Sequence, residues 1–234
     1  MSVTVITSVL NSSEFLDQFI ENMEAQTIFD DCEFMFLDAD SDDDSRDKIL
    51  KAVQKHKNVQ YWNVGRKKIY PTWNIGVKLA KTPYITNWNT DDRRTPHSLE
   101  VQRDCLADNE DVDLCYGITL WTTEPNKNLS ETHTTDQFPC LEPSLESLLQ
   151  VNSPHCMPMW TKRLHEKYGL FNEDFFSAGD YELWLRAMKN GSKFMKINNV
   201  VGSYYRNPTG ISSNPETIDR AVEEVLQIKQ FYNQ

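Results

Sequence analysis

Short apolar runs alternate with amphipathic stretches through residues 3–87, and this alternation limits the folds open to the chain. Residues 3–9 form a nearly continuous β-branched run, which is typical of a strand buried on both faces of a parallel sheet. Further strand patterns lie at 33–37, 59–62 and 84–86, and the intervals between them carry apolar residues at helical spacing. Strands that alternate with helices predict an α/β fold, with a Rossmann-like, mostly parallel sheet and helices on both faces.

The second part of the chain has longer polar stretches and fewer strand patterns. Helical patterns lie at 145–149, 163–168, 180–189 and 215–234, and a strand is expected near 196–201. No flexible linker or internal repeat divides the sequence. A single domain made of two fused halves is therefore predicted.

Composition excludes several classes of partner. The chain has 234 residues with six Trp, nine Tyr and eleven Phe, which favours a packed globule. A formal net charge of −11 argues against nucleic acid or an anionic membrane as the main partner. No apolar run approaches the length of a bilayer span. The five cysteines are scattered, which fits reduced thiols in a cytoplasmic protein; a peripheral membrane location or a place within a longer chain stays open.

Two adjacent acids, Asp91 and Asp92, follow the strand pattern at 84–86. Adjacent carboxylates repel each other unless a cation lies near, and a divalent ion is usually held by one or two carboxylates plus substrate phosphates. A solvated turn before Pro96 is the alternative, because Asp-Asp pairs are common in loops. Polar residues end the other strand patterns too, and ligands of such sheets bind beyond the carboxyl ends of the strands. The pattern therefore favours a cleft that binds metal and phosphate.

A third acid, Asp180, follows Gly179 at the start of a predicted helix. A carboxylate there is stabilised by backbone N–H groups and the helix dipole, so a plain N-cap is the alternative. If Asp180 faces the same cleft as Asp91, it is a candidate general base for an incoming hydroxyl group.

Other side chains have weaker signals. Lys67, in the basic cluster 66–68, could contact phosphates or lie in a solvated turn. Trp121 and Trp160 are candidates for stacking on acceptor sugar rings, whereas Trp184 is expected in the core. Residues 122–136 are expected to form a mobile rim of the acceptor site. Three histidines without metal-ligand spacing are expected on the surface: His97, His133 and His165.

The motifs together resemble glycosyltransferase family 2, over residues 3 to about 212. The segments that carry the resemblance are, in order, Val3-Thr4-Val5-Ile6-Thr7-Ser8, Asp38-Ala39-Asp40-Ser41, Trp73-Asn74-Ile75-Gly76, Asn89-Thr90-Asp91-Asp92 and Gly179-Asp180-Tyr181-Glu182. The resemblance implies the GT-A fold, with a nucleotide-sugar-binding half at 1–118 and an acceptor-binding half at 119–234. It also implies an inverting transferase that uses Mn²⁺ or Mg²⁺, a nucleotide-sugar donor, with UDP-sugars favoured, and a glycan or glycosylated acceptor.

The resemblance also implies roles for individual residues. Asp180 matches the catalytic base, and Asp91 the metal ligand under the diphosphate, with Asp92 as a flanking acid of the metal site. His155 and Arg186 are expected beside the acceptor, together with Trp160. The remaining expected donor contacts are Thr7, Val9, Asp38, Lys67, Asn74, Asn89 and Arg206.

Three positions depart from the family pattern. Asn89 replaces the first acid of the Asp-x-Asp motif, and Ala39 replaces an acid that often reads uracil, which weakens the case for UDP over GDP or dTDP. Asn207 follows Arg206 where a histidine is often found. The alternatives are a nucleotidyltransferase, although residues 9–13 lack the Gly-rich loop expected of one, and a non-catalytic nucleotide- or glycan-binding module, which Asn89 favours and Asp91 and Asp180 oppose.

Overall fold

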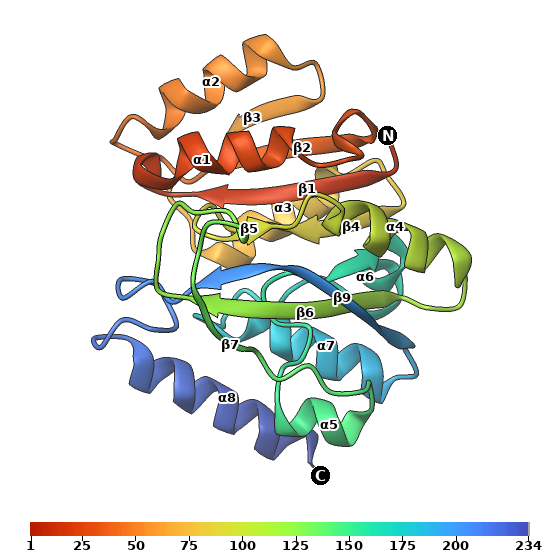
Figure 1. Ribbon diagram of the computed structural model, residues 1–234. Helices are drawn as coiled ribbons and strands as arrows, with labels where there is room; N and C mark the ends of the chain where they lie inside the picture. Colours follow the sequence, from red (N-terminus) through yellow and green to blue (C-terminus); the bar gives the residue numbers. More distant parts are fainter. Residues whose placement is uncertain (234) are drawn as a thin grey trace.

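The computed structural model describes residues 1–233 and contains one sheet of nine strands (Figure 1). The strand order is β3-β2-β1-β4-β8-β6-β9-β5, and β7 pairs with β6 outside this path. The sheet therefore runs without interruption from the first part of the chain into the second.

The first four strands form the parallel part of the sheet, as the sequence pattern predicted. They are β1 (Val3–Val9), β2 (Cys32–Asp38), β3 (Val59–Asn63) and β4 (Tyr84–Asn87). β1 lies between β2 and β4, and β3 pairs with the far edge of β2, all in parallel. Their carboxyl ends consequently point to one edge of the sheet.

The second part of the chain extends the same sheet. Its strands are β5 (Arg93–Arg94), β6 (Leu114–Thr122), β7 (Thr134–Gln137), β8 (Met159–Thr161) and β9 (Phe194–Tyr205). β8 is antiparallel to both β4 and β6, whereas β6 and β9 are parallel to each other. β9 is longer than its sequence pattern predicted, because its pairing with β6 continues through register shifts as far as Tyr205.

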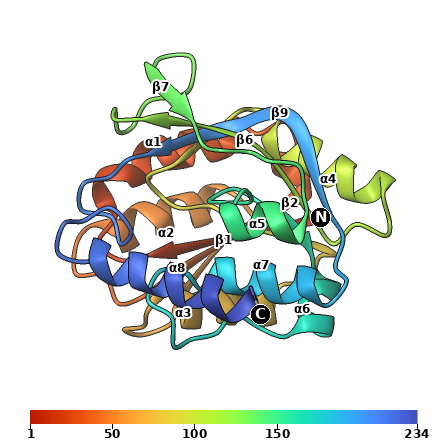
Figure 2. The ribbon, with the colours of Figure 1, turned by 90° about the horizontal axis from the view of Figure 1, so that it is seen from below.

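Helices cover both faces of the sheet (Figure 2). One face packs against α1 (Ser13–Glu24), α2 (Ser45–Lys55) and α4 (Ser98–Asp108), and a short 3₁₀ helix, η1, lies at Phe29–Asp31. The other face packs against α3 (Ile69–Leu79), α5 (Leu145–Gln150), α6 (Lys162–Tyr168), α7 (Gly179–Lys189) and α8 (Ile218–Tyr232). Because side chains alternate along a strand, Val5 and Phe34 face the first group while Ile6 and Met35 face the second. The predicted GT-A-like α/β architecture is confirmed.

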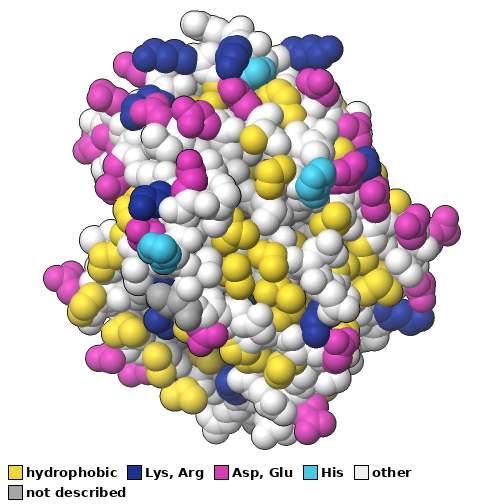
Figure 3. All heavy atoms as spheres, viewed as in Figure 1, with side chains coloured by type: hydrophobic (Ala, Val, Ile, Leu, Met, Phe, Trp, Pro, Cys, Tyr) yellow, Lys and Arg dark blue, Asp and Glu magenta, His cyan; other side chains and the backbone are white. Residues whose placement is uncertain are grey.

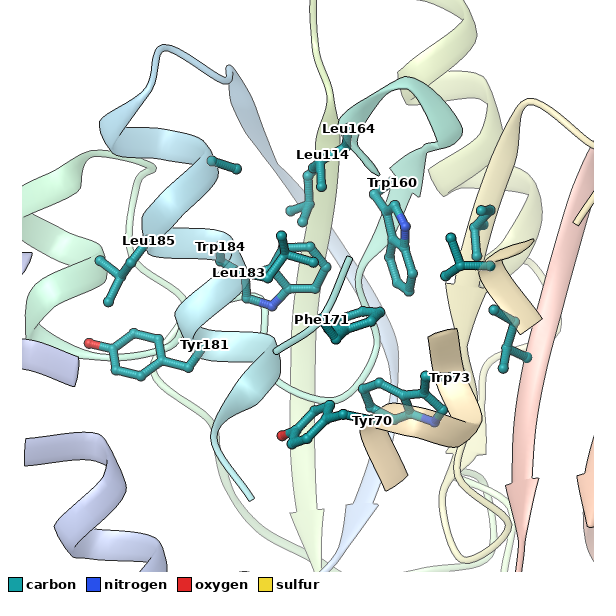
Figure 4. Packing of buried hydrophobic residues seen from close by; sticks show 14 of the residues in the cluster. Tyr70, Trp73, Leu114, Trp160, Leu164, Phe171, Tyr181, Leu183, Trp184 and Leu185 are labelled. Carbon is teal, nitrogen blue, oxygen red and sulfur yellow. The ribbon is translucent and has the colours of Figure 1, made fainter. Parts of the chain in front are cut away.

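An aromatic cluster joins α3 to the second part of the chain (Figure 4). Phe171 packs its ring against Tyr70, Trp73 and Trp184 at centroid distances of 5.9, 5.4 and 6.0 Å. Close packing also fixes α3 on the sheet, because a Cβ added at Gly76 would lie 2.9 Å from the Ile6 side chain. α3 therefore holds Tyr70 in a defined place beside α7.

Candidate active site

A cavity of about 680 Å³ lies at the carboxyl ends of β1 and β4. One end is lined by Ser8 and by the segment 87–91, which follows β4. The other end is lined by segments before and within α7 and α8. Asn89, Asp91, His155 and Asp180 all line it, so the structure brings together four of the side chains predicted from the sequence.

The loop after β4 is held by two buried arginines. Arg93 Nη1 donates to the carbonyl oxygens of Thr90 and Asp92 at 2.9 and 2.7 Å. Arg94, which is 2% exposed, donates to Asn87 O and to the Thr86 hydroxyl. These bonds fix the backbone on either side of the two acids.

Asp91 and Asp92 point in different directions. Asp91 lines the cavity, and its Oδ2 accepts a hydrogen bond from Asn207 Nδ2 at 3.0 Å. Burial raises the pKa of Asp91 above its usual range. Asn207 stands where the family pattern often has a histidine. Its amide therefore contacts the Asp91 carboxylate, which is the group expected to bind metal.

The structure corrects the prediction that Asp92 is a metal ligand. It is fully buried, and its two oxygens accept hydrogen bonds from Asn89 Nδ2 at 3.1 Å and from the backbone N–H of Tyr205 at 3.2 Å. Burial, and then the charge of Asp91, raise the pKa of Asp92 well above its usual range. Asp92 ties the Asp91 loop to β9 and does not reach the cavity.

The donor set around Asp91 fits a divalent ion only with help from the substrate. Among residues 1–233, no group of three or more His, Cys, Asp and Glu side chains is placed to hold a metal. At the β1–β4 end of the cavity, Asp91 offers a carboxylate, with the Asn89 amide nearby; the carboxylate of Asp180 lies on α7. One carboxylate completed by phosphate oxygens and water is a usual way of holding Mg²⁺. The residues therefore fit an ion that binds together with a diphosphate.

Asp180 lies in the first turn of α7, where Gly179 allows a close approach to α3. A Cβ at position 179 would lie 2.8 Å from the ring of Tyr70, so only glycine fits there without a shift. The Tyr70 hydroxyl donates to Asp180 Oδ1 at 3.1 Å, and Asn152 Nδ2 donates to Oδ2 at 3.1 Å. Burial raises the pKa of Asp180, whereas these two bonds oppose that rise. A positioned carboxylate with a raised pKa is suited to accept a proton near neutral pH.

The segment that carries Asn152 and His155 is fixed by local contacts. Helix α5 begins with a capping box in which Ser144 and Ser147 exchange hydrogen bonds. His155 has a left-handed backbone, with φ at 47°, and stacks on Phe138 at a centroid distance of 3.8 Å. Burial lowers the pKa of His155 to about 3, so the ring is neutral. His155 therefore presents a flat, uncharged ring to the cavity.

Several predicted donor contacts lie elsewhere. Thr7 and Val9 are 2% and 1% exposed, so neither side chain is open to a ligand; their neighbour Ser8 lines the cavity instead. Asn74 is 1% exposed, and its amide group bonds to the backbone of Phe171 and to Glu173. The predicted side-chain contacts of these three residues are wrong because the side chains are used inside the fold, whereas the backbone contacts expected of Thr7 and Val9 stay a prediction.

Two of the predicted acceptor contacts are also wrong. Trp160 is 1% exposed within the aromatic cluster of Figure 4, and its Nε1 donates to His165 Nε2 at 2.9 Å. Arg186 binds Glu182 and the backbone carbonyls of Tyr168 and Leu170, outside the cavity. Trp184, in contrast, is buried in the core as predicted.

Arg206 and Trp121 form a pair at the rim of the sheet. The Arg206 guanidinium carbon lies 3.9 Å from the centre of the Trp121 ring, a cation–π contact, and neither residue lines the cavity. Among the described side chains of 122–136, none lines the cavity, and Asn126 anchors the segment through bonds with Arg93 and Glu14 O. That the segment is a mobile rim that orders when an acceptor binds stays a prediction.

Asp38 is the last residue of β2 and is 1% exposed, and Lys67 follows the end of β3. Asp38 accepts bonds from the Tyr61 hydroxyl at 2.8 Å and from Ser41 N and Oγ at 2.9 and 2.7 Å. It therefore orders the turn after β2, which was not foreseen. Lys67 is exposed in the loop between β3 and α3.

The histidines divide between surface and interior. His97 and His133 are exposed as predicted, but His165 is 7% exposed. Its Nε2 accepts from the Trp160 indole, so the proton of the neutral ring is on Nδ1, which bonds to Gly169 O at 3.0 Å. Burial lowers the pKa of His165 to about 4.

The fold and the cavity define a glycosyltransferase of the GT-A class. The sequence model described as "Glycosyl transferase family 2" matches residues 4–167, and the chain belongs to this family. An uncharacterized glycosyltransferase of Methanocaldococcus jannaschii is 25% identical over 86% of this chain and 70% of its own length. Chondroitin synthase of Escherichia coli is 26% identical over 85% of this chain, which spans 28% of that enzyme.

Solved structures share the fold at low sequence identity. TarS 1–349 of S. aureus in complex with UDP-GlcNAc has a TM-score of 0.78 at 15% identity, covering 99% of this chain and 66% of TarS 1–349. The mannosyltransferase PcManGT of Pyrobaculum calidifontis, with GDP-Man and Mn²⁺, has a TM-score of 0.68 at 15% identity, covering 98% of this chain and 69% of its own. In the part of this chain that the structure describes, no helix is long and apolar enough to cross a bilayer.

Proposed function

We propose that this protein transfers a sugar from a nucleoside-diphosphate sugar, with UDP-sugars favoured, to a hydroxyl group of a glycan or another acceptor. Asp91 and Asp180 come from distant segments and line one cavity, and this observation carries the proposal. Asp91 lines the cavity from the loop after β4, and Asp180 lines it from the first turn of α7. That separation suits a donor and an acceptor that meet between them.

The donor is expected at the β1–β4 end of the cavity. Ser8, Asn87, Asn89 and Thr90 offer polar groups there. A divalent ion, Mn²⁺ or Mg²⁺, held by Asp91 and the diphosphate, would neutralise the charge that develops on the leaving group. Lys67, in the loop between β3 and α3, remains a candidate for a contact to the phosphates, whereas Asp38 is 1% exposed and its oxygens are bonded within the fold. TarS in complex with UDP-GlcNAc and PcManGT in complex with GDP-Man share the fold and support a nucleotide-sugar donor.

The acceptor hydroxyl needs a base, because it is a poor nucleophile at neutral pH. In the proposed step, Asp180 takes the hydroxyl proton while the acceptor oxygen bonds to the anomeric carbon. The bond from that carbon to the diphosphate oxygen breaks, and the nucleoside diphosphate leaves with the bonding electrons. A single displacement of this kind inverts the anomeric centre.

Tyr70 and Asn152 support this role of Asp180. Each donates to a different oxygen of the carboxylate, and the two bonds fix the plane of the group. Both bonds favour the ionised form, against the effect of burial. No cation makes an ion pair with Asp180 in the described residues that would hold it permanently charged. This environment favours a base over a merely structural carboxylate.

A thermal-shift screen of nucleotide sugars with and without Mn²⁺ tests the proposal. A ligand that binds the folded state raises the melting temperature with occupancy. UDP-sugars with Mn²⁺ are expected to give the largest shift, and slow release of free sugar from the same donor would show that the site is catalytic. Binding without turnover would support the alternative of a non-catalytic module, whereas the family membership argues against a nucleotidyltransferase.

A further inference from the structure

The end of the cavity beside α8 differs in chemistry from the donor end. Four aliphatic side chains of α8 line it: Ala221, Val222, Val225 and Leu226. Ile211, in the loop before α8, adds a fifth. Bare sugars are bound through hydrogen bonds and aromatic stacking, and these five side chains offer neither; the polar residues that line the cavity on and before α8 include Lys229, Thr209 and Ser212. The aliphatic wall suits an apolar group that lies beside the acceptor hydroxyl.

The aliphatic wall continues onto the outer surface of α8. Ile218, Val222 and Leu226 are 40, 51 and 60% exposed, and their spacing of four residues places them along one side of the helix. Figure 3 shows apolar side chains gathered over this helix, at the lower left of the view. Val222 and Leu226 belong to both the cavity wall and the exposed strip, so the two surfaces are continuous.

Helix α8 is fixed relative to the proposed base. The Glu224 carboxylate accepts hydrogen bonds from three backbone N–H groups just before α7, those of Phe176, Ser177 and Ala178, at 2.6, 2.8 and 3.2 Å. Ile228 and Tyr232 are buried on the inner side of the helix. Glu224 therefore fixes α8, and the strip on it, relative to the segment that leads into Asp180, and both line the same cavity.

We propose that the acceptor carries an alkyl chain next to the hydroxyl that receives the sugar, and that this chain lies along Ile218, Val222 and Leu226. This inference rests on the proposed function and names the acceptor class for it. An anionic membrane surface is a poorer occupant, because the chain has a net charge of −11. Contiguous exposed apolar side chains beside a cavity are a usual mark of a ligand site.

The test compares octyl β-D-glucopyranoside, below its micelle concentration, with methyl β-D-glucopyranoside. Binding of each is followed by amide NMR on the full chain, with UDP and Mn²⁺ present. The octyl compound is expected to bind more tightly and to shift signals of α8 and of the cavity around Asp180. The double variant Val222→Gln/Leu226→Gln is expected to weaken octyl binding about tenfold, or ~1.4 kcal/mol, and to leave methyl binding unchanged.

Phe231→Gln is the matched control. Phe231 is 66% exposed on the same helix, does not line the cavity, and lies about 140° around the helix from Leu226. Equal loss of octyl binding in this control would mean nonspecific adsorption and would overturn the inference. Equal affinities of the two glucosides in the wild type would overturn it as well.

Two further measurements identify other occupants. A wild-type dimer that Leu226→Gln converts to a monomer would assign the strip to a second copy of the chain. Binding to neutral phosphatidylcholine vesicles without octyl glucoside binding would assign it to a membrane surface. Either result contradicts an acceptor chain.

UDP affinity on the same samples separates the two proposals. If UDP binds but the octyl and methyl glucosides bind equally, only the inference is defeated. If no nucleotide binds, the proposed function is defeated.

Discussion

The Tyr70 hydroxyl donates a hydrogen bond to Asp180 Oδ1 at 3.1 Å, and this contact joins α3 to the start of α7. Asn152 completes the arrangement on Oδ2. Both donors favour the ionised carboxylate, whereas burial favours the protonated one. The pKa of Asp180 is therefore set by a balance that single substitutions can move.

Tyr70→Phe and Asn152→Ala are each expected to raise the pKa of Asp180 further. Because the ionised form is the base, kcat/KM rises with pH through this pKa, and the rising limb should move to higher pH. The measurement is kcat/KM against pH. Tyr181→Phe is the control, because its hydroxyl bonds to Leu148 O and not to Asp180. If the rising limb stays in place in both Tyr70→Phe and Asn152→Ala, the two hydrogen bonds do not lower the pKa of Asp180.

Substitutions of Asp91 and Asp92 are expected to have different effects: one on metal binding, the other on stability. Asp91→Ala should abolish the increase in UDP affinity that Mn²⁺ produces, since Asp91 offers the carboxylate at the β1–β4 end of the cavity. Asp92→Asn should keep that increase but lower the free energy of unfolding by ~1–3 kcal/mol, because one of its two buried acceptors becomes a donor. Calorimetry of UDP with and without Mn²⁺ and denaturant unfolding measure the two effects. The reverse pattern would show that Asp92 is the ligand.

Gly179→Ala is expected to lower both stability and turnover. The added Cβ would lie 2.8 Å from the Tyr70 ring, so α7 or the ring must shift, at a cost of ~1–3 kcal/mol. The shift also displaces Asp180 from its donor. Melting temperature and turnover check the prediction, and the double variant Gly179→Ala/Tyr70→Ala should regain part of the lost stability. A single variant as stable and active as the wild type would contradict the close approach.

His165 is expected to make the fold sensitive to acid. Its pKa is about 4 when folded, against 6.5 for the ordinary ring, so the unfolded chain binds more protons between these values. The free energy of unfolding should consequently fall as pH drops from 6.5 to 4, by up to ~3 kcal/mol from this residue. Denaturant unfolding at about pH 7.5 and about pH 4.5 should show a smaller difference in His165→Gln than in the wild type. An identical difference would mean that His165 is protonated within the fold.

The periodic parts of the sequence predicted the fold well, because apolar spacing alone distinguishes the buried strands β1, β2 and β4 from the amphipathic helices between them. The acids that line the cavity followed from their places after β4 and at the start of α7. The prediction that Trp160 stacks on an acceptor sugar was wrong, because the burial of this side chain depends on how distant elements pack, which local spacing does not encode. The prediction for Asp92 was wrong because the turn at 89–92 directs its carboxylate to Asn89 and to the backbone of Tyr205, which the sequence pattern does not encode. Tyr70 and Asn152 were missed because neither stands in a pattern; the Gly179-Asp180 pair was the one hint of a close neighbour.

Asp180→Asn tests the central claim, that Asp180 is the base of a glycosyl transfer. The amide has nearly the same size and can still cap α7, so donor affinity and melting temperature should stay close to those of the wild type. It cannot take up the hydroxyl proton at neutral pH, so turnover should fall by roughly two to four orders of magnitude. Turnover, donor affinity and melting temperature are to be measured on one preparation with a donor found in the screen. More than about a tenth of wild-type turnover would contradict the assignment, as would a lowered melting temperature with full activity in the folded fraction.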